Sequence, residues 1–451
     1  MLPKNGLFKQ FGDAGGDRRP GGAGLSPPNG DDIAAPAGPR VKTGGGRRQP
    51  WWPGVLGYRD FRLLWLGQLF ALSGFWMQNV AQGWLVLELS DSPLLLGTVS
   101  AAANIPIFLL SLLGGAVADR VDRARLVVVT RSVLAALTAV LALLITLELI
   151  TIPIFVGLVA AMGVVWAFDI PARQSLIPAL VPRRAIQDAI ALNSVVVNGT
   201  RIVAPALAGV LVGLIGVAGV YWLTAACYLG LVWMASKIRP RDSAAGDPPV
   251  RTTVWQDVVE GLGYIWSNRL VFSLLLVSLI PAVFGLAYVP LVPVFARDIL
   301  RVGVGGLGLL YGASGAGALL GSGAVALIGA RFPRGPILLW SGLAFSLTVV
   351  GFALVPHFGF ALLALTAAGF TQALFQTLNT SLALGAIPAA YQGRVMSIYM
   401  LTWGLQSLGS LFAGALADRA GAPLAVATTG VITLVFILGM WAAARPLRQL
   451  R

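Results

Sequence analysis

Charged side chains are scarce in this chain. Only 11% of its 451 residues are Asp, Glu, Lys or Arg, whereas 57% are hydrophobic and the mean hydropathy is +0.81. A soluble globular domain carries about 25% charged residues. The deficit excludes an ordinary soluble domain and predicts an all-α integral membrane protein with many helices.

Cysteine and histidine are rarer still, with one residue of each kind, Cys227 and His357. A disulfide framework or a thiolate metal cluster needs several cysteines. A membrane-bound transferase would need carboxylates or histidines clustered at an interface, and the phosphate-binding loop of ATP-driven pumps is absent. We therefore expect no metal site, no cofactor and no enzymatic reaction.

Basic residues exceed acidic ones, so that the net charge is +14. In a soluble protein such an excess favours a nucleic-acid partner. Here the arginines lie in short loops and tails, where arginines set membrane topology and contact anionic lipid headgroups. We expect a lipid bilayer around this chain and no nucleic acid as its partner.

The apolar runs divide the chain into a tail and twelve predicted membrane spans. Residues 1–50 are rich in glycine and proline, and we expect a disordered tail without a signal peptide. A span needs about 20 apolar residues. The predicted spans are 62–87, 93–117, 126–147, 152–171, 189–214, 217–236, 270–295, 306–328, 335–355, 358–386, 395–417 and 423–444. They form an N-terminal bundle at 51–236 and a C-terminal bundle at 270–451, joined by a linker at 237–269.

Arginine placement orients these spans. The loops after even-numbered spans are basic, and most loops after odd-numbered spans have neither Lys nor Arg. The exceptions are Arg297, Arg301 and Arg419. Because basic loops stay in the cytoplasm, both ends of the chain are predicted to be cytoplasmic.

The linker contains an amphipathic stretch. Trp255, Leu262 and Trp266 fall on one helical face, and Thr253 with Gln256 fits a capping box. We expect a helix over 253–266 at the cytoplasmic membrane interface.

The two halves resemble each other. Residues 204–211 of the fifth span align with 409–416 of the eleventh, and 112–114 align with 319–321. A nearly constant offset of half the chain indicates a duplicated six-helix unit. Two such halves can rock about a site near the membrane midplane.

One arginine lies deep in a predicted span. Arg201 is about twelve residues into the fifth span, about 18 Å from its end at ~1.5 Å per residue. An arginine at that depth costs at least about 2.5–3.5 kcal/mol, so it needs a cavity or a partner. It either meets an anionic or strongly polar group of a cargo, or it makes a permanent contact with carbonyls or polar side chains. Arg131 lies early in its span and is expected to reach the cytoplasmic face.

Uncharged amides also lie within the spans, where they are expected to face the interior. They either bind a cargo, the interpretation we favour, or hold helices together. The candidates are Gln78, Asn79, Gln82, Gln372, Gln376, Asn379 and Gln406. Trp76, Trp84, Tyr399 and Trp403 would either stack on a planar cargo or serve in packing.

The loop at 114–125 resembles the signature loop of the major facilitator superfamily. Gly115, Asp119, Arg120 and Arg123 occupy matching positions, whereas Asp122 stands where the family usually has glycine. Residues 204–209 are similar to the fifth-helix motif of family antiporters, in which Pro205 would permit a bend and Gly209 a close helix approach.

The resemblance implies a cytoplasmic gate. Asp169 would pair with Arg120 or Arg123, and Asp119 would face the start of the eleventh span, at 393–397. Such a cluster would join the two halves on the cytoplasmic side, hold an outward-open state and break when that side opens.

Segments 79–89, 168–174 and 189–194 are similar to a bacterial branch of drug and siderophore exporters, the transmembrane secretion effectors. The resemblance implies a monomeric twelve-helix transporter in the bacterial cytoplasmic membrane that exports a small amphiphilic molecule by alternating access. The proton-motive force would drive it, with the proton as coupling ion, although no carboxylate lies clearly at mid-depth. An uptake permease on the same fold and a non-transporting sensor or scaffold that uses the tail remain alternatives.

Overall fold

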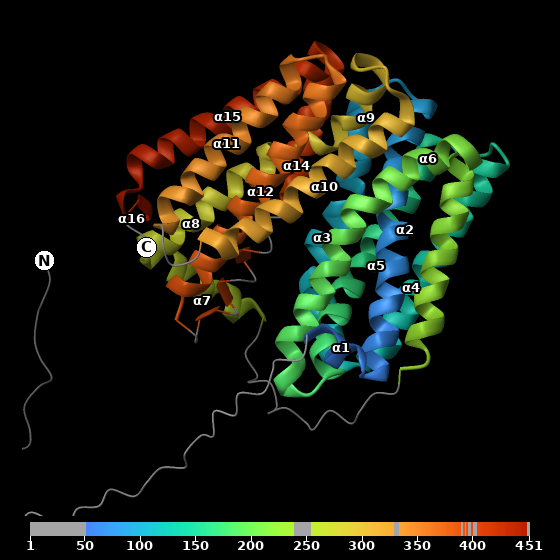
Figure 1. Cartoon of the computed structure of the whole chain (residues 1–451), viewed down its shortest axis with the longest axis horizontal. Helices are drawn as coiled ribbons and strands as arrows, with labels where there is room; N and C mark the ends of the chain where they lie inside the picture. Colours follow the sequence, from blue (N-terminus) through green and yellow to red (C-terminus); the bar gives the residue numbers. More distant parts are fainter. Residues whose placement is uncertain are drawn as a thin grey trace, which may run out of the picture. The chain divides into compact units, whose positions relative to one another are not determined.

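The structure is a computed structural model that describes residues 51–451 except 239–253, 329–332, 389–390, 393, 396–397, 400–403 and 449–451. The tail predicted at 1–50 lies outside these residues. Every regular element in the described part is helical, so the expected all-helical fold is confirmed (Figure 1).

The first half contains five long helices. They are preceded by the short α1 (Trp51–Leu56), and a 3₁₀ turn, Arg183–Ala185, leads into the last of them. The long helices are α2 (Arg59–Leu89), α3 (Pro93–Arg120), α4 (Arg123–Thr146), α5 (Ile152–Ala179) and α6 (Ile186–Ala235).

One of these helices covers two predicted spans. Helix α6 turns at Gly216, whose φ of 72° lies in the left-handed region that glycine adopts without strain. The turn separates the segments predicted at 189–214 and 217–236.

The second half begins with the linker helix α7 (Val254–Ser267) and ends with the short α16 (Arg445–Arg448). The elements between them are α8 (Arg269–Ile280), α9 (Val292–Val294), α10 (Gly303–Ile328), α11 (Arg334–Leu354), α12 (Phe358–Ala386), α14 (Gln406–Ala420) and α15 (Ala422–Ala443). In the described part, nine helical segments are long and apolar enough to cross a membrane. These do not include α2 or α14, so twelve spans are not established by these helices alone.

The predicted span at 270–295 is broken. Helix α8 ends at Ile280 and is followed by π-helical turns at Pro281–Gly285 and Phe295–Ile299, with a 3₁₀ turn at Val289–Leu291 between them. Pro281, Pro290 and Pro293 each lack the N–H that continues a helix, which accounts for the change of helical type. We call residues 281–299 the broken segment.

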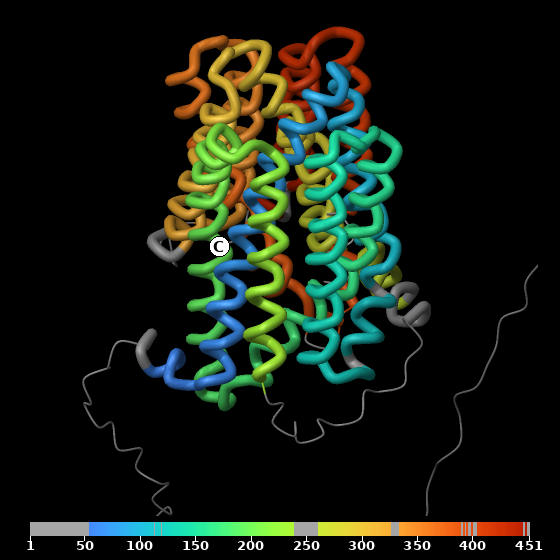
Figure 2. Tube along the Cα trace, turned by 90° about the vertical axis from the view of Figure 1, so that its right-hand side faces the viewer, coloured from blue at the N-terminus to red at the C-terminus, as the bar shows by residue number. Residues whose placement is uncertain are grey.

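Within each half the helices pack along their length. Helix α2 contacts α6, α3 contacts α5, and α4 contacts α6, as the tube view in Figure 2 also shows. In the second half α10 contacts α12, and α11 contacts both α12 and α15. Glycines permit close approaches: Gly114 lies against the Ala167 carbonyl, and Gly369 lies against the Ser314 carbonyl.

The linker helix is attached to the second half. Glu260 forms an ion pair with Arg394 at 2.6 Å, and the rings of Tyr264 and Tyr391 stack with their centroids 4.6 Å apart. The helix expected over 253–266 is therefore present as α7, although Thr253, its expected first residue, lies outside the described residues.

The two halves meet through α6 with α10 and through α3 with α14. Gly308 of α10 lies against the Pro205 carbonyl of α6, and the Ser100 and Ser410 hydroxyls are 3.5 Å apart. Farther toward the Pro93 end of α3, Ser92 donates to Asp418 at 2.7 Å.

Arg297 makes a further contact between the halves. It pairs with Asp91 at 2.9 Å and donates to the Leu87 carbonyl, while Asp298 neutralises it locally at 2.7 Å. Arg297 is one of the exceptions to the absence of Lys and Arg in the predicted outer loops. In the structure it has two carboxylates as partners.

The close contact between α6 and α10 generates a test with Gly308→Val. A Cβ at Gly308 would lie 2.5 Å from the Pro205 carbonyl oxygen, so the helices must separate. Overpacking of this kind costs about 1–3 kcal/mol. We expect the melting temperature of the purified protein to fall by several degrees.

The control for this test is Gly323→Val in the same helix, where a Cβ would meet nothing within 4 Å. The control should melt close to the wild type. Equal melting temperatures for the two variants would contradict the assignment of this contact.

Candidate functional site

A cavity lies where the two halves meet. Its volume is about 600 Å³ with its open mouth included. Helices α2 and α6 form its wall on one side, and the broken segment and α10 form it on the other. We call it the Arg201 cavity. Its lining includes Trp76, Asn79, Arg201, Tyr288, Tyr311 and Ser314.

Among the described residues that line this cavity, Arg201 is the only one with a charged side chain. Its guanidinium carbon lies 5.7 Å from the centroid of the Trp76 ring, a cation–π distance. Among the residues that the structure describes, none makes an ion pair or a hydrogen bond with its side chain. The arginine that sequence analysis placed deep in a span therefore faces open space between the halves.

A second cavity of about 530 Å³ adjoins the first, with which it shares Asn79, Val289 and Tyr311. Asn79 is exposed to both and donates to the Phe75 carbonyl of its own helix at 2.8 Å. Gln82 and Asn104 also line this second cavity. Asn79 and Gln82 are thus the predicted amides that border open volume in this conformation.

The other predicted amides lie elsewhere. Gln78 is buried, donates to the Met162 sulfur at 3.3 Å and accepts from the Tyr228 hydroxyl at 3.2 Å. Gln376 and Asn379 both donate to the Tyr399 hydroxyl, at 2.9 and 3.3 Å. In this conformation these three side chains hold helices together.

Two further predicted residues, Gln372 and Gln406, are half-buried and line neither cavity. Pro205 borders the Arg201 cavity, and Gly209 lies against Val304 and Gly305 of the second half. The predicted motif at 204–209 therefore lies on the contact between the halves.

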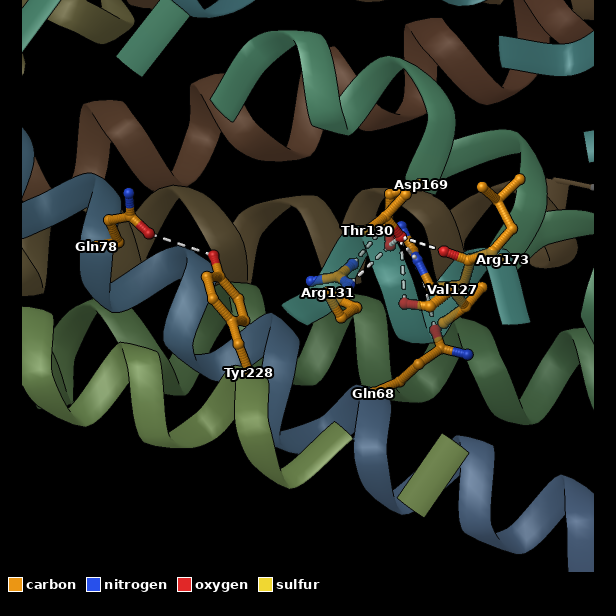
Figure 3. A network of polar contacts seen from close by, with 9 residues as sticks. Gln68, Gln78, Val127, Thr130, Arg131, Asp169, Arg173 and Tyr228 are labelled. Carbon is orange, nitrogen blue, oxygen red and sulfur yellow. Dashed lines mark hydrogen bonds and ion pairs between the residues drawn. The ribbon is translucent and has the colours of Figure 1, made fainter. Parts of the chain in front are cut away.

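A cluster of buried charges lies inside the first half (Figure 3). Arg131 binds Asp169 through two hydrogen bonds, from Nε at 2.8 Å and from Nη2 at 2.6 Å. Arg173 approaches the same carboxylate at 3.4 Å, and the Thr130 hydroxyl donates to it at 3.1 Å. We call these four residues the Asp169 cluster.

The Asp169 cluster fixes three helices to one another. Arg131 comes from α4, Asp169 comes from α5, and Arg173 donates to Gln68 of α2 at 3.2 Å. The Arg131 guanidinium also lies 4.5 Å from the Trp166 ring centroid, which helps to compensate the second positive charge.

Two expectations about these residues were wrong. Arg131 does not reach the membrane surface, because its side chain is fully buried against Asp169. The ion-pair partners of Asp169 are Arg131 and Arg173 rather than Arg120 or Arg123. Arg120 is exposed, and Arg123 donates to the Ser175 carbonyl at 3.3 Å.

The Asp169 cluster belongs to the first half alone, so this part of the expected gate does not join the halves. The remaining part of the gate concerns the side chain of Asp119 and residues 393 and 396–397, which lie outside the described residues. Gly115, half-buried in α3, has open space around it.

The sequence contains a signal for the pairing of Arg131 with Asp169. Arg131 lies eight residues into α4, and Asp169 lies ten residues before the end of α5. At ~1.5 Å per residue these positions are about 12 and 15 Å from the same membrane face. The predicted spans 126–147 and 152–171 already place both residues near the same end of neighbouring antiparallel helices, and the similar depth appears once the helix ends of the structure are used.

Removal of the buried carboxylate tests the Asp169 cluster. Asp169→Asn leaves two buried arginines without an anion, and breaking such a pair costs about 3–5 kcal/mol. We expect a strongly reduced yield of folded protein and a lower melting temperature. Arg131→Gln combined with Asp169→Asn should recover part of both.

The matched control is Glu88→Gln, which removes an exposed carboxylate at a helix end. This variant should behave as the wild type. A stability of Asp169→Asn equal to that of this control would show that the ion pairs are dispensable.

Comparison with known proteins identifies the family. The profile of the transmembrane secretion effector family matches residues 50–449. The Staphyloferrin A transporter of Staphylococcus aureus is 24% identical over 381 residues, covering 83% of this chain and 94% of that protein. The multidrug efflux pump Tap of Mycolicibacterium fortuitum is 27% identical over 375 residues, covering 80% and 89%.

Solved transporter structures share the fold. A bacterial homologue of the human lysosomal transporter Spinster, inward-facing and unoccupied, matches with a TM-score of 0.68 at 16% identity, covering 86% of this chain and 98% of that one. A POT family transporter in complex with a thioalcohol-conjugated peptide matches with a TM-score of 0.69 at 13% identity, covering 86% and 96%. This chain therefore belongs to the transmembrane secretion effector family of the major facilitator superfamily and is a multi-pass membrane transporter.

Proposed function

We propose that this protein exports a small amphiphilic molecule, such as a drug, a siderophore or a secondary metabolite, across a bacterial cytoplasmic membrane. The observation that carries the proposal is the Arg201 cavity, because both halves of the chain form its walls. A cavity between two halves changes its accessibility when the halves rock, which is the requirement of alternating access. The names of the relatives, an efflux pump and a siderophore transporter, agree with such a cargo.

The contacts between the halves support an assignment of this conformation. Ser92 with Asp418 and Arg297 with Asp91 lie at helix ends that arginine placement predicts to be outside. With both termini in the cytoplasm, as we propose, these contacts hold the outer ends of the two halves together and leave the cytoplasmic side for cargo entry. Cargo would enter from that side before the outer contacts separate.

The signature loop is the proposed cytoplasmic counterpart of these contacts. Gly115, Asp119, Arg120 and Arg123 would meet the second half when the cytoplasmic side closes. Arg123 already fastens this end of α4 to the Ser175 carbonyl of α5. We propose that the protein works as a monomer and that the proton-motive force supplies the energy, as the family resemblance implies.

The export proposal is tested by comparing small molecules inside and outside cells that lack this protein with those of a complemented strain. We expect a compound to be retained inside the deletion cells and to appear in the medium of the complemented strain. Metabolite profiling by mass spectrometry of both fractions is the measurement.

Two other results would contradict export. A compound left in the medium by the deletion cells would indicate uptake instead. No difference under several growth conditions would favour a sensor, and a variant without residues 1–50 should then lose its output.

A further inference from the structure

We propose that the Arg201 cavity is an anion site and that the cargo carries a carboxylate beside a flat apolar group. This inference rests on the proposed function, because it names the chemical class of the molecule that the transporter carries. It follows from the different partners of two deep arginines, from the remaining lining of the cavity and from the position of the cavity between the halves.

The chain compensates one deep arginine internally and leaves the other without an anion. Arg131 receives both oxygens of Asp169. Arg201, in the same half, has the Trp76 ring beside it and no ion pair or hydrogen bond with any residue that the structure describes. A guanidinium has five N–H donors, and buried donors without acceptors are costly. The donors of Arg201 are therefore available to a ligand in the cavity.

No carboxylate of the chain competes for this arginine in the described cavity lining. Asp169 is fully buried within its own cluster. The outer carboxylates Asp91, Asp298 and Asp418 are occupied by Arg297 or Ser92. The anion that complements Arg201 therefore has to come from the cargo, and a carboxylate matches the planar fork of a guanidinium.

The rest of the lining fits a flat apolar body. The polar group of Tyr311 is already paired, because its hydroxyl donates to the Val289 carbonyl at 3.1 Å. Val292 and Leu310 continue the apolar wall, and Trp76 provides the largest aromatic surface. This lining, mostly apolar with a few polar groups, has the composition of a small-molecule site.

The position of Arg201 connects binding to movement. A Cβ at Gly315 of α10 would lie 2.7 Å from the Arg201 carbonyl oxygen, so Arg201 belongs to the contact between the halves. A carboxylate bound there is held by the first half while its apolar body rests on Tyr288 and Leu310 of the second. Such a ligand binds the two conformations of the transporter with unequal affinity. A ligand shifts the equilibrium between two conformations only through such a difference.

The test uses purified full-length protein in nanodiscs and two probes of nearly equal shape, 1-naphthoate and its neutral amide, 1-naphthamide. Isothermal titration calorimetry measures binding of each probe. We expect the naphthoate to bind about tenfold more tightly than the amide, the usual value of one charge-assisted interaction. Arg201→Gln should abolish this preference and leave amide binding unchanged.

Two variants control for folding and for general charge. Arg201→Lys keeps the positive charge and should retain part of the preference for naphthoate. Arg125→Gln removes an arginine whose side chain is 88% exposed and should bind both probes as the wild type does. Size-exclusion chromatography verifies that each variant is folded.

The anion site is refuted if folded wild-type protein binds the amide as tightly as the naphthoate, or binds no naphthoate. Unchanged naphthoate binding by folded Arg201→Gln would refute it as well. If Arg201→Gln does not fold, Arg201→Lys takes its place in the test. A preference for naphthoate in Arg201→Lys that is as large as in Arg125→Gln, which should bind as the wild type does, would decide against the anion site. If cells export the cargo but the protein shows no preference for a carboxylate, only this inference fails. If the protein prefers the carboxylate but the cells export nothing, the proposed function fails.

Discussion

A guanidinium inside a membrane protein must be compensated by a partner or by an accessible cavity, and this constraint organises the first half of the chain. Arg131 has its partner in Asp169, and the resulting cluster fixes α2, α4 and α5 to one another. Arg201 has a cavity instead. One arginine therefore serves packing, and the other remains available for binding.

The cavity depends on how closely the halves approach. Small residues bring the α6 and α10 backbones together at Gly308, which lies against Pro205, and at Gly315, which lies against Arg201. The broken segment then supplies Tyr288 where a continuous helix would have presented other side chains. Proline and glycine, which weaken single helices, here create the contact and the open volume beside it.

Sequence reasoning predicted the parts of this arrangement that depend on position along one helix. The apolar runs gave the helices, and the depth of Arg201 gave its place in the interior. Choices of partner were harder, since they depend on packing between helices. Asp169 was assigned to the signature loop, although Arg131 lies at its own depth on the neighbouring helix. Of the predicted amides, Asn79 and Gln82 border the cavities, whereas Gln78, Gln376 and Asn379 bond to neighbouring helices, a distinction that periodicity does not contain.

The central claim is that the halves must part along α3 and α14 for the cargo to leave. Ser100 and Ser410 have hydroxyls 3.5 Å apart across this contact, and cysteine is nearly isosteric with serine. The decisive measurement is efflux by Ser100→Cys with Ser410→Cys, in a Cys227→Ser background, before and after oxidation. We expect the disulfide to stop efflux, a reductant to restore it, and each single variant to be unaffected. Efflux at the wild-type rate by fully cross-linked protein would contradict the account.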